Sequence, residues 1–227
     1  MIGYWNKSVY ITYLGAMVSV LGYLMFCKTA DPDWAFAGMI LAAVCDMFDG
    51  KVARKIKNRT EQEKEFGVQI DSLADIVAFI VIPSLTLYGL GLNQVYQLIL
   101  ISLYVVCGVI RLAYFNVAMS DKDKAIKVYT GLPVPVSVLI FGIVWMLAKF
   151  IPFVDSNQVI ILTILLPIVG YLHISKIKIK KFTGSWFYIL ISVVALLAII
   201  IGAILLEIDK GFFILFSFVD IMRVVVR

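Results

Sequence analysis

The stretch CDMFDGKVAR, residues 45–54, decides how the fold is interpreted, because it places two aspartates at the end of an apolar run. The preceding run, WAFAGMILAAV (residues 34–44), contains no charged residue and is typical of a membrane-spanning helix. Ionisable groups within a span are costly and usually face a cavity, a partner or a pathway. Asp46 and Asp49 therefore mark a candidate functional site at the edge of a membrane.

The composition supports a membrane protein throughout. Of the 227 residues, 62% are hydrophobic, whereas about 45–50% is usual in globular domains. Long uncharged runs recur from end to end, and they leave no room for a large soluble domain. Three cysteines without metal-type spacing argue against a disulfide framework or a zinc site. His173 is the sole histidine, which excludes a histidine-rich metal site.

Because a spanning helix needs about 20 mostly apolar residues, we expect an all-α, polytopic transmembrane bundle. The eight predicted spans are 8–27, 33–56, 67–90, 94–117, 132–152, 157–174, 185–206 and 211–226. They form one integral-membrane domain, residues 1–227. Within it we expect residues 1–175 to form a six-helix catalytic core, and residues 185–227 to hold two additional C-terminal spans.

The loops predict the orientation. By alternation of the spans, 16 lysines and arginines fall on one side, whereas Lys28, Lys149 and Lys210 fall on the other. The positive-inside rule then predicts a multi-pass protein of the cytoplasmic membrane, with both termini and the aspartate-rich loop in the cytoplasm. The net charge of +5 is explained by this topology, so we expect anionic membrane lipids and no nucleic acid as partners.

Helical geometry brings the acidic residues together. One face of the second span carries Asp46, Asp49, Gly50 and Ala53, and one face of the third carries Gly67, Asp71 and Asp75. The short loop between these spans makes them antiparallel neighbours. The four carboxylates are therefore expected to converge at one depth, near the cytoplasmic surface.

Four carboxylates at close range repel one another and need cations or protons. Oxygen ligands favour hard divalent ions such as Mg²⁺, Mn²⁺ or Ca²⁺. Two such ions can clamp a diphosphate. The small residues Gly50, Ala53 and Gly67 would leave room for a ligand, or would allow close helix packing. Arg54 would hold a phosphate oxygen, or would serve as a topology charge.

The spacing Asp46-x2-Asp49-Gly50-x2-Ala53-Arg54-x12-Gly67-x3-Asp71-x3-Asp75 resembles the signature of the CDP-alcohol phosphotransferases, an integral-membrane family that makes phospholipids. Every fixed position of that signature is filled. The resemblance implies a six-helix core of that family's type, a homodimer and a CDP-linked lipid donor. It implies two divalent cations, Mg²⁺ or Mn²⁺, held by Asp46, Asp49, Asp71 and Asp75. It also implies that Asp75 is the general base, and that the CDP-lipid is bound around Asp46, Gly50, Ala53, Arg54 and Gly67.

Three further stretches resemble the membrane-bound phosphatidylserine synthases of this family: FGVQIDSLADIVAFIVIPS (66–84), GVIRLAYFNV (108–117) and YTGLPVPVSV (129–138). This resemblance implies CDP-diacylglycerol and L-serine as substrates. Arg111 would bind the serine carboxylate, or would pair with an aspartate, and Asn116 would bind serine or cap its helix.

Three other functions remain open at this point. The acceptor could be glycerol 3-phosphate or an inositol phosphate, although several basic groups would then be expected around the cavity. An ion transporter would place its carboxylates near the bilayer midplane. A membrane scaffold without catalytic activity would not require this spacing of glycines and aspartates.

Overall fold

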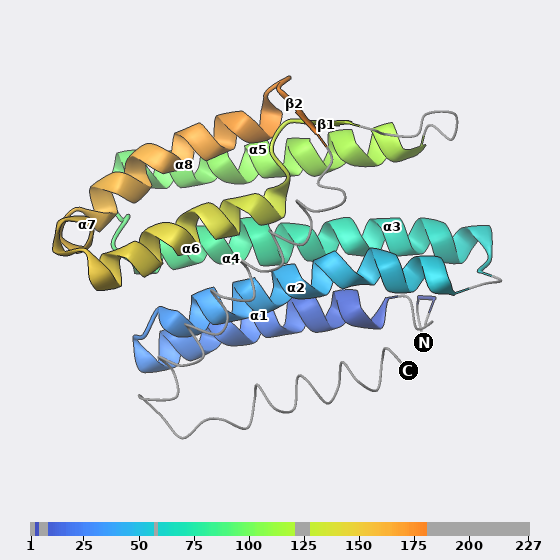
Figure 1. The fold of residues 1–227 in the computed structure, drawn as a ribbon, viewed down its shortest axis with the longest axis horizontal. Helices are drawn as coiled ribbons and strands as arrows, with labels where there is room; N and C mark the ends of the chain where they lie inside the picture. Colours follow the sequence, from blue (N-terminus) through green and yellow to red (C-terminus); the bar gives the residue numbers. More distant parts are fainter. Residues whose placement is uncertain (1–2, 5–8, 57–58, 121–127, 181–227) are drawn as a thin grey trace. The chain divides into compact units, whose positions relative to one another are not determined.

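The computed structural model describes residues 3–4, 9–56, 59–120 and 128–180, and these are mainly helical (Figure 1). The longer helices are α1 (Tyr10–Thr29), α2 (Asp33–Lys55), α3 (Glu61–Asp75), α5 (Val95–Ser120), α6 (Val134–Phe150) and α8 (Gln158–Ile174). The shorter elements are the π-helix η1 (Ile76–Val81), α4 (Ile82–Gly89), α7 (Pro152–Ser156), and the strands β1 (Val128–Thr130) and β2 (Lys178–Lys180).

The predicted class, a helical membrane bundle, is confirmed. Among the described residues, three helices are long and apolar enough to cross a membrane: Tyr10–Thr29, the continuous helix Glu61–Gly89 and Val95–Ala118. Val134–Phe150 and Gln158–Ile174 are shorter apolar helices. Helix α2 has 23 residues but carries the charged residues of the signature. The last two predicted spans, 185–206 and 211–226, lie outside the described residues, so the number of spans stays a prediction.

The chain folds as two compact units. The described part of the first unit ends at Ala74, and that of the second begins at Asp75 and ends at Lys180. In the first unit α1 packs closely against α2, because glycines meet where the helices approach. A Cβ atom on Gly22 would lie 2.5 Å from the Trp34 carbonyl oxygen, and one on Gly38 would lie 2.6 Å from the Val18 carbonyl oxygen. Side chains at these positions would force the helices apart.

Helix α3 begins earlier than predicted. The third span was expected from residue 67, but the helix starts at Glu61, so the polar run before Gly67 is helical. A capping box explains this difference. The Glu63 amide donates to Thr60 Oγ1 at 3.2 Å, and the Thr60 amide donates to Glu63 Oε2 at 2.8 Å. An ion pair of 2.8 Å between Lys64 and Glu61 adds to this first turn.

The second unit begins with a π-helical turn, η1, directly after Asp75. In an α-helix the Phe79 carbonyl would accept from the amide of residue 83, but Pro83 has no N–H. The Tyr104 hydroxyl donates to this carbonyl at 2.9 Å, and the Ser137 hydroxyl approaches it at 3.4 Å. The Tyr104 side chain of α5 therefore bonds the carbonyl that Pro83 cannot serve, while the Ser137 hydroxyl of α6 donates to the Val134 carbonyl at 2.6 Å.

A tight turn joins β1 to α6 and lies on the end of α8. Gly131 has a φ of +77°, and a Cβ atom there would lie 2.5 Å from the His173 carbonyl oxygen. The Leu132 amide donates to the Leu172 carbonyl at 2.9 Å. β1 and β2 pair antiparallel beside this turn, with Tyr129 opposite Ile179. Neither strand was predicted from the sequence.

Candidate active site

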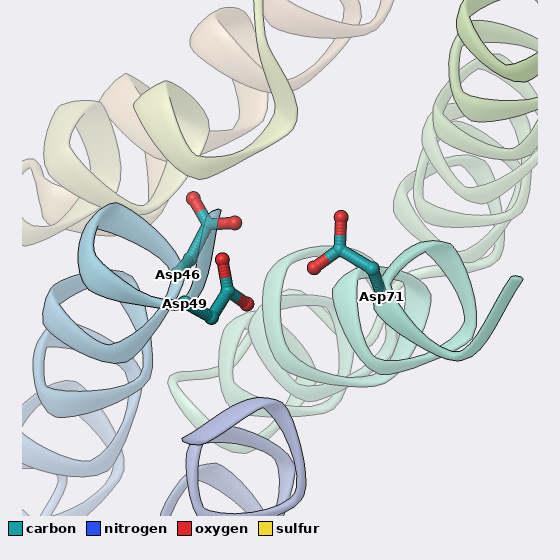
Figure 2. Close-up of side chains that lie close together, drawn as sticks. All are labelled: Asp46, Asp49 and Asp71. Carbon is teal, nitrogen blue, oxygen red and sulfur yellow. The ribbon is translucent and has the colours of Figure 1, made fainter. Parts of the chain in front are cut away.

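Three of the four predicted aspartates converge (Figure 2). Asp46 and Asp49 extend from α2, and Asp71 reaches towards them from α3. One carboxylate oxygen from each side chain lies within 4.8 Å of the others. Asp49 is 8% exposed, and Asp46 and Asp71 are half-buried. The predicted convergence of the two helices is thus confirmed for these three residues.

Helix α1 contributes Thr12, whose contact with an aspartate of the cluster was not predicted from the sequence. The Thr12 hydroxyl donates to Asp49 Oδ2 at 3.1 Å, and both side chains are buried. The close packing of α1 on α2 positions this hydroxyl: a Cβ atom on Gly15, one turn further along α1, would lie 3.1 Å from Cys45 Cβ. Thr12 therefore orients one carboxylate of the cluster. No sequence spacing signals such a contact between α1 and α2.

The three carboxylates fit a divalent cation. Their oxygens are hard ligands, which suit Mg²⁺, Mn²⁺ or Ca²⁺. Carboxylates this close repel one another strongly where water is scarce, and a cation between them would offset that repulsion. Asp46, Asp49 and Asp71 together could therefore hold a metal ion.

Asp75 is not among these three residues. It ends α3 one helical turn after Asp71, is half-buried, and is followed directly by the π-helical turn η1. Its assignment as a metal ligand and as general base stays a prediction.

The small residues of the signature lie on the predicted helices. Gly50 and Ala53 follow the first two aspartates on α2, and Gly67 precedes Asp71 by one turn on α3. Within the described part of the chain, a Cβ atom on Gly67 would have a single near neighbour, Arg59 Nη1 at 3.9 Å, so these residues leave open space at this position. Arg59 belongs to the basic loop between α2 and α3. Arg54 lies in the last turn of α2, and its side chain is outside the described part.

The two residues predicted to bind the acceptor lie on α5. Arg111 is 5% exposed, donates from Nε to the Leu132 carbonyl at 3.2 Å, and lies over the Phe115 ring at 5.6 Å. Asn116 is half-buried on the same helix. The structure thus buries the in-span arginine, as its position predicts, and anchors it to the turn before α6. Whether either residue binds an acceptor stays a prediction.

These features define a class: a helical membrane protein with a carboxylate cluster suited to divalent cations. The chain belongs to the CDP-alcohol phosphatidyltransferase family, whose model matches residues 5–169. That match covers every residue of the aspartate signature, Arg111 and Asn116.

Several relatives carry the same enzyme name. CDP-diacylglycerol–serine O-phosphatidyltransferase of Methanocaldococcus jannaschii is 32% identical over 195 residues, which is 85% of this chain and 83% of that protein. The Saccharomyces cerevisiae enzyme of that name is 33% identical over 156 residues, 63% of this chain and 55% of that protein. Archaetidylserine synthase of Methanothermobacter thermautotrophicus is 38% identical over 119 residues, 51% of this chain and 48% of that protein. The chain thus matches about half the length of the latter two.

Proposed function

We propose that this chain transfers the phosphatidyl group of CDP-diacylglycerol to L-serine, releasing phosphatidylserine and CMP. The observation that carries the proposal is the convergence of Asp46, Asp49 and Asp71 within the family's signature. The names of the relatives support serine as the acceptor, above all that of the relative matched over 85% of this chain.

The metal assignment follows from the donor set. Asp46, Asp49 and Asp71 would hold the divalent cation, and Asp75 would contribute to the same site, which the family resemblance expects to take two ions of Mg²⁺ or Mn²⁺. When bound, such ions would neutralise negative charge on the diphosphate and on the leaving phosphate oxygen.

The chain's own side chains would position the reactants and move one proton. Asp75 accepts the proton of the serine hydroxyl. The serine oxygen then forms a bond to the phosphorus that bears the lipid, and the bond from this phosphorus to CMP breaks. Arg111 binds the serine carboxylate through its planar guanidinium. Positioning and charge stabilisation would supply most of the rate, as in other phosphoryl transfers.

The lipid substrate accounts for the place of the site. Open space beside Gly67, and the small side chains at Gly50 and Ala53, would admit the CDP-lipid headgroup, with Arg54 near its phosphates. The acyl chains would stay in the bilayer while the nucleotide remains near water. We further propose that both termini and this site face the cytoplasm, and that the enzyme works as a homodimer.

The direct test is CMP release by the purified full-length protein with CDP-diacylglycerol, Mg²⁺ or Mn²⁺, and a panel of acceptors. We expect CMP only with serine, and none when EDTA is in excess. CMP release with glycerol 3-phosphate or an inositol phosphate, but not with serine, would reject the acceptor. Asp75→Asn should abolish turnover but retain binding of the CDP-lipid; near-normal turnover in that variant would reject the base assignment.

A further inference from the structure

His173, which the proposed mechanism does not use, is buried next to Arg111. It ends α8, is 1% exposed, and its Nδ1 lies 3.0 Å from the Leu132 carbonyl oxygen. The same oxygen accepts the bond from Arg111 Nε at 3.2 Å. The two nitrogens therefore lie no more than about 6 Å apart. All three residues belong to the unit that begins with Asp75.

The hydrogen bond fixes which nitrogen of His173 carries the proton. A carbonyl oxygen can only accept, so Nδ1 must be the donor. The Arg111 guanidinium already brings a full positive charge to this carbonyl, and an imidazolium beside it, with no anion between the two, would be repelled. We therefore assign the neutral imidazole, in which Nε2 carries a lone pair and no proton.

That lone pair is buried and unsatisfied. Nε2 has no hydrogen-bond partner among the residues that the structure describes. Buried polar atoms are nearly always hydrogen-bonded, so an exception calls for a partner of a particular kind. Here the partner must be a donor, because Nε2 can only accept. The Tyr104 hydroxyl does not serve, since it bonds to Phe79 and Ser137.

We propose that His173 Nε2 accepts a hydrogen bond from the ammonium group of the acceptor amino acid. This proposal rests on the proposed function. It assigns a binding partner to the ammonium group of serine, which the cationic Arg111 cannot bind. An α-amino acid carries its carboxylate and its ammonium on one carbon atom. The Leu132 carbonyl oxygen holds the Arg111 guanidinium and the His173 imidazole close together. The guanidinium is a cation that suits the carboxylate, and the imidazole is a neutral acceptor that suits the ammonium group.

The position along the helices is consistent with this role. Tyr104, Gly108 and Arg111 are at i, i+4 and i+7 on α5, so they share one face. Tyr104 from that face contacts the His173 ring, with centroids 5.7 Å apart, and bonds to the η1 turn that follows Asp75. Arg111, His173 and the proposed base therefore belong to one connected set of packed elements.

His173 is the chain's sole histidine, so the intact enzyme offers a direct probe. With ¹⁵N-labelled histidine, the NMR spectrum should show Nδ1 protonated and Nε2 bare. Saturating L-serine should shift the Nε2 resonance, whereas 3-hydroxypropanoate, which is serine without its amino group, should leave it unchanged. An unshifted Nε2 at serine concentrations that support CMP release, or an equal shift with both compounds, would overturn the proposal.

Kinetics of two variants give an independent test. His173→Asn keeps a donor for the Leu132 carbonyl but removes Nε2, so the serine KM should rise at least tenfold, a loss of about 1.4 kcal/mol. The KM for the CDP-lipid and the inhibition constant of 3-hydroxypropanoate should stay within twofold of wild type. His173→Gln, which returns a polar group near the Nε2 position, should recover part of the serine affinity.

If His173 only stabilised the fold and did not contact the ligand, His173→Asn would weaken the binding of serine and of 3-hydroxypropanoate alike. That result would contradict the proposal. If His173 instead took the hydroxyl proton, kcat would fall without a selective rise in the serine KM. Wild-type protein that releases no CMP with serine would reject the proposed function itself. A failure of His173→Asn to change the serine KM in an active enzyme rejects only the ammonium contact.

Discussion

Replacing Tyr104 with phenylalanine would test the hydrogen bond that secures the π-helical turn after Asp75. The hydroxyl donates to the Phe79 carbonyl at 2.9 Å, at the position where Pro83 cannot supply an amide. The ring itself would be retained, and it packs edge-on against Phe141 at 5.8 Å. The substitution therefore removes the hydroxyl's contacts with the Phe79 carbonyl and the Ser137 hydroxyl, with little change in volume.

The size of the loss in unfolding free energy depends on which donors remain for the Phe79 carbonyl after the substitution. Hydrogen bonds between membrane helices are worth about 0.6 kcal/mol on average and up to about 1.7 kcal/mol. Leaving a buried acceptor poorly satisfied costs about 1–3 kcal/mol. The side-chain donor left to the Phe79 carbonyl is Ser137 Oγ at 3.4 Å, which is long for a hydroxyl donor. We therefore expect Tyr104→Phe to lower the free energy of unfolding by about 1.5 kcal/mol.

The assay is unfolding in mixed micelles, followed by tryptophan fluorescence. Tyr96→Phe is the matched control, because Tyr96 is on the same helix and is 58% exposed; it should change stability by less than about 0.5 kcal/mol. In a Pro83→Ala background, residue 83 regains its amide, so Tyr104→Phe should cost less. A loss no larger than the control's, or an equal loss in both backgrounds, would refute this account of the turn.

Three further changes test the helix packing and the site. Thr12→Val removes the hydroxyl bonded to Asp49, so about tenfold more Mg²⁺ should be needed for half-maximal CMP release. Thr29→Val, at the other end of α1, is the control and should have no effect. Equal Mg²⁺ dependence of the two variants would contradict this role of Thr12. Gly38→Ala should destabilise the protein by about 1–3 kcal/mol, because its Cβ would overlap the Val18 carbonyl. Gly67→Ala should be neutral or stabilising by up to about 1 kcal/mol. If both variants changed the unfolding free energy with the same sign in an unfolding titration, the packing argument would be refuted. Arg111→Lys keeps the charge but loses the planar guanidinium, so the serine KM should rise about tenfold while the KM for the CDP-lipid holds; unchanged serine kinetics would remove the carboxylate contact.

The aspartate cluster could be predicted from sequence because its geometry is local. Asp46 and Asp49 are three residues apart on one helix, Asp71 follows on the next, and a short loop makes those helices neighbours. Periodicity and chain connectivity alone therefore place the carboxylates together. Apolar runs also located helices at the first six predicted spans, because such a run is a property of each segment by itself.

The contacts that support the site could not be predicted, because they join residues that are distant in sequence. Thr12 reaches Asp49 across 37 positions, and Ser137 reaches Phe79 across 58. The Leu132 carbonyl joins Arg111 to His173 only once α8 packs against the turn before α6. The early start of α3, in contrast, could have been predicted from the sequence. The Thr60–Glu63 capping box is a local signal, but the prediction followed the apolar pattern, which begins later.

Binding of Mn²⁺ to the purified protein, followed by electron paramagnetic resonance, tests most directly whether Asp46, Asp49 and Asp71 form one cation site. Asp49→Asn removes one of the three carboxylates, and Asp155→Asn removes an exposed carboxylate from α7 as a control. We predict that Asp49→Asn weakens Mn²⁺ binding at least tenfold and that Asp155→Asn leaves it unchanged. Wild-type affinity for Mn²⁺ in the Asp49→Asn protein would contradict the shared site.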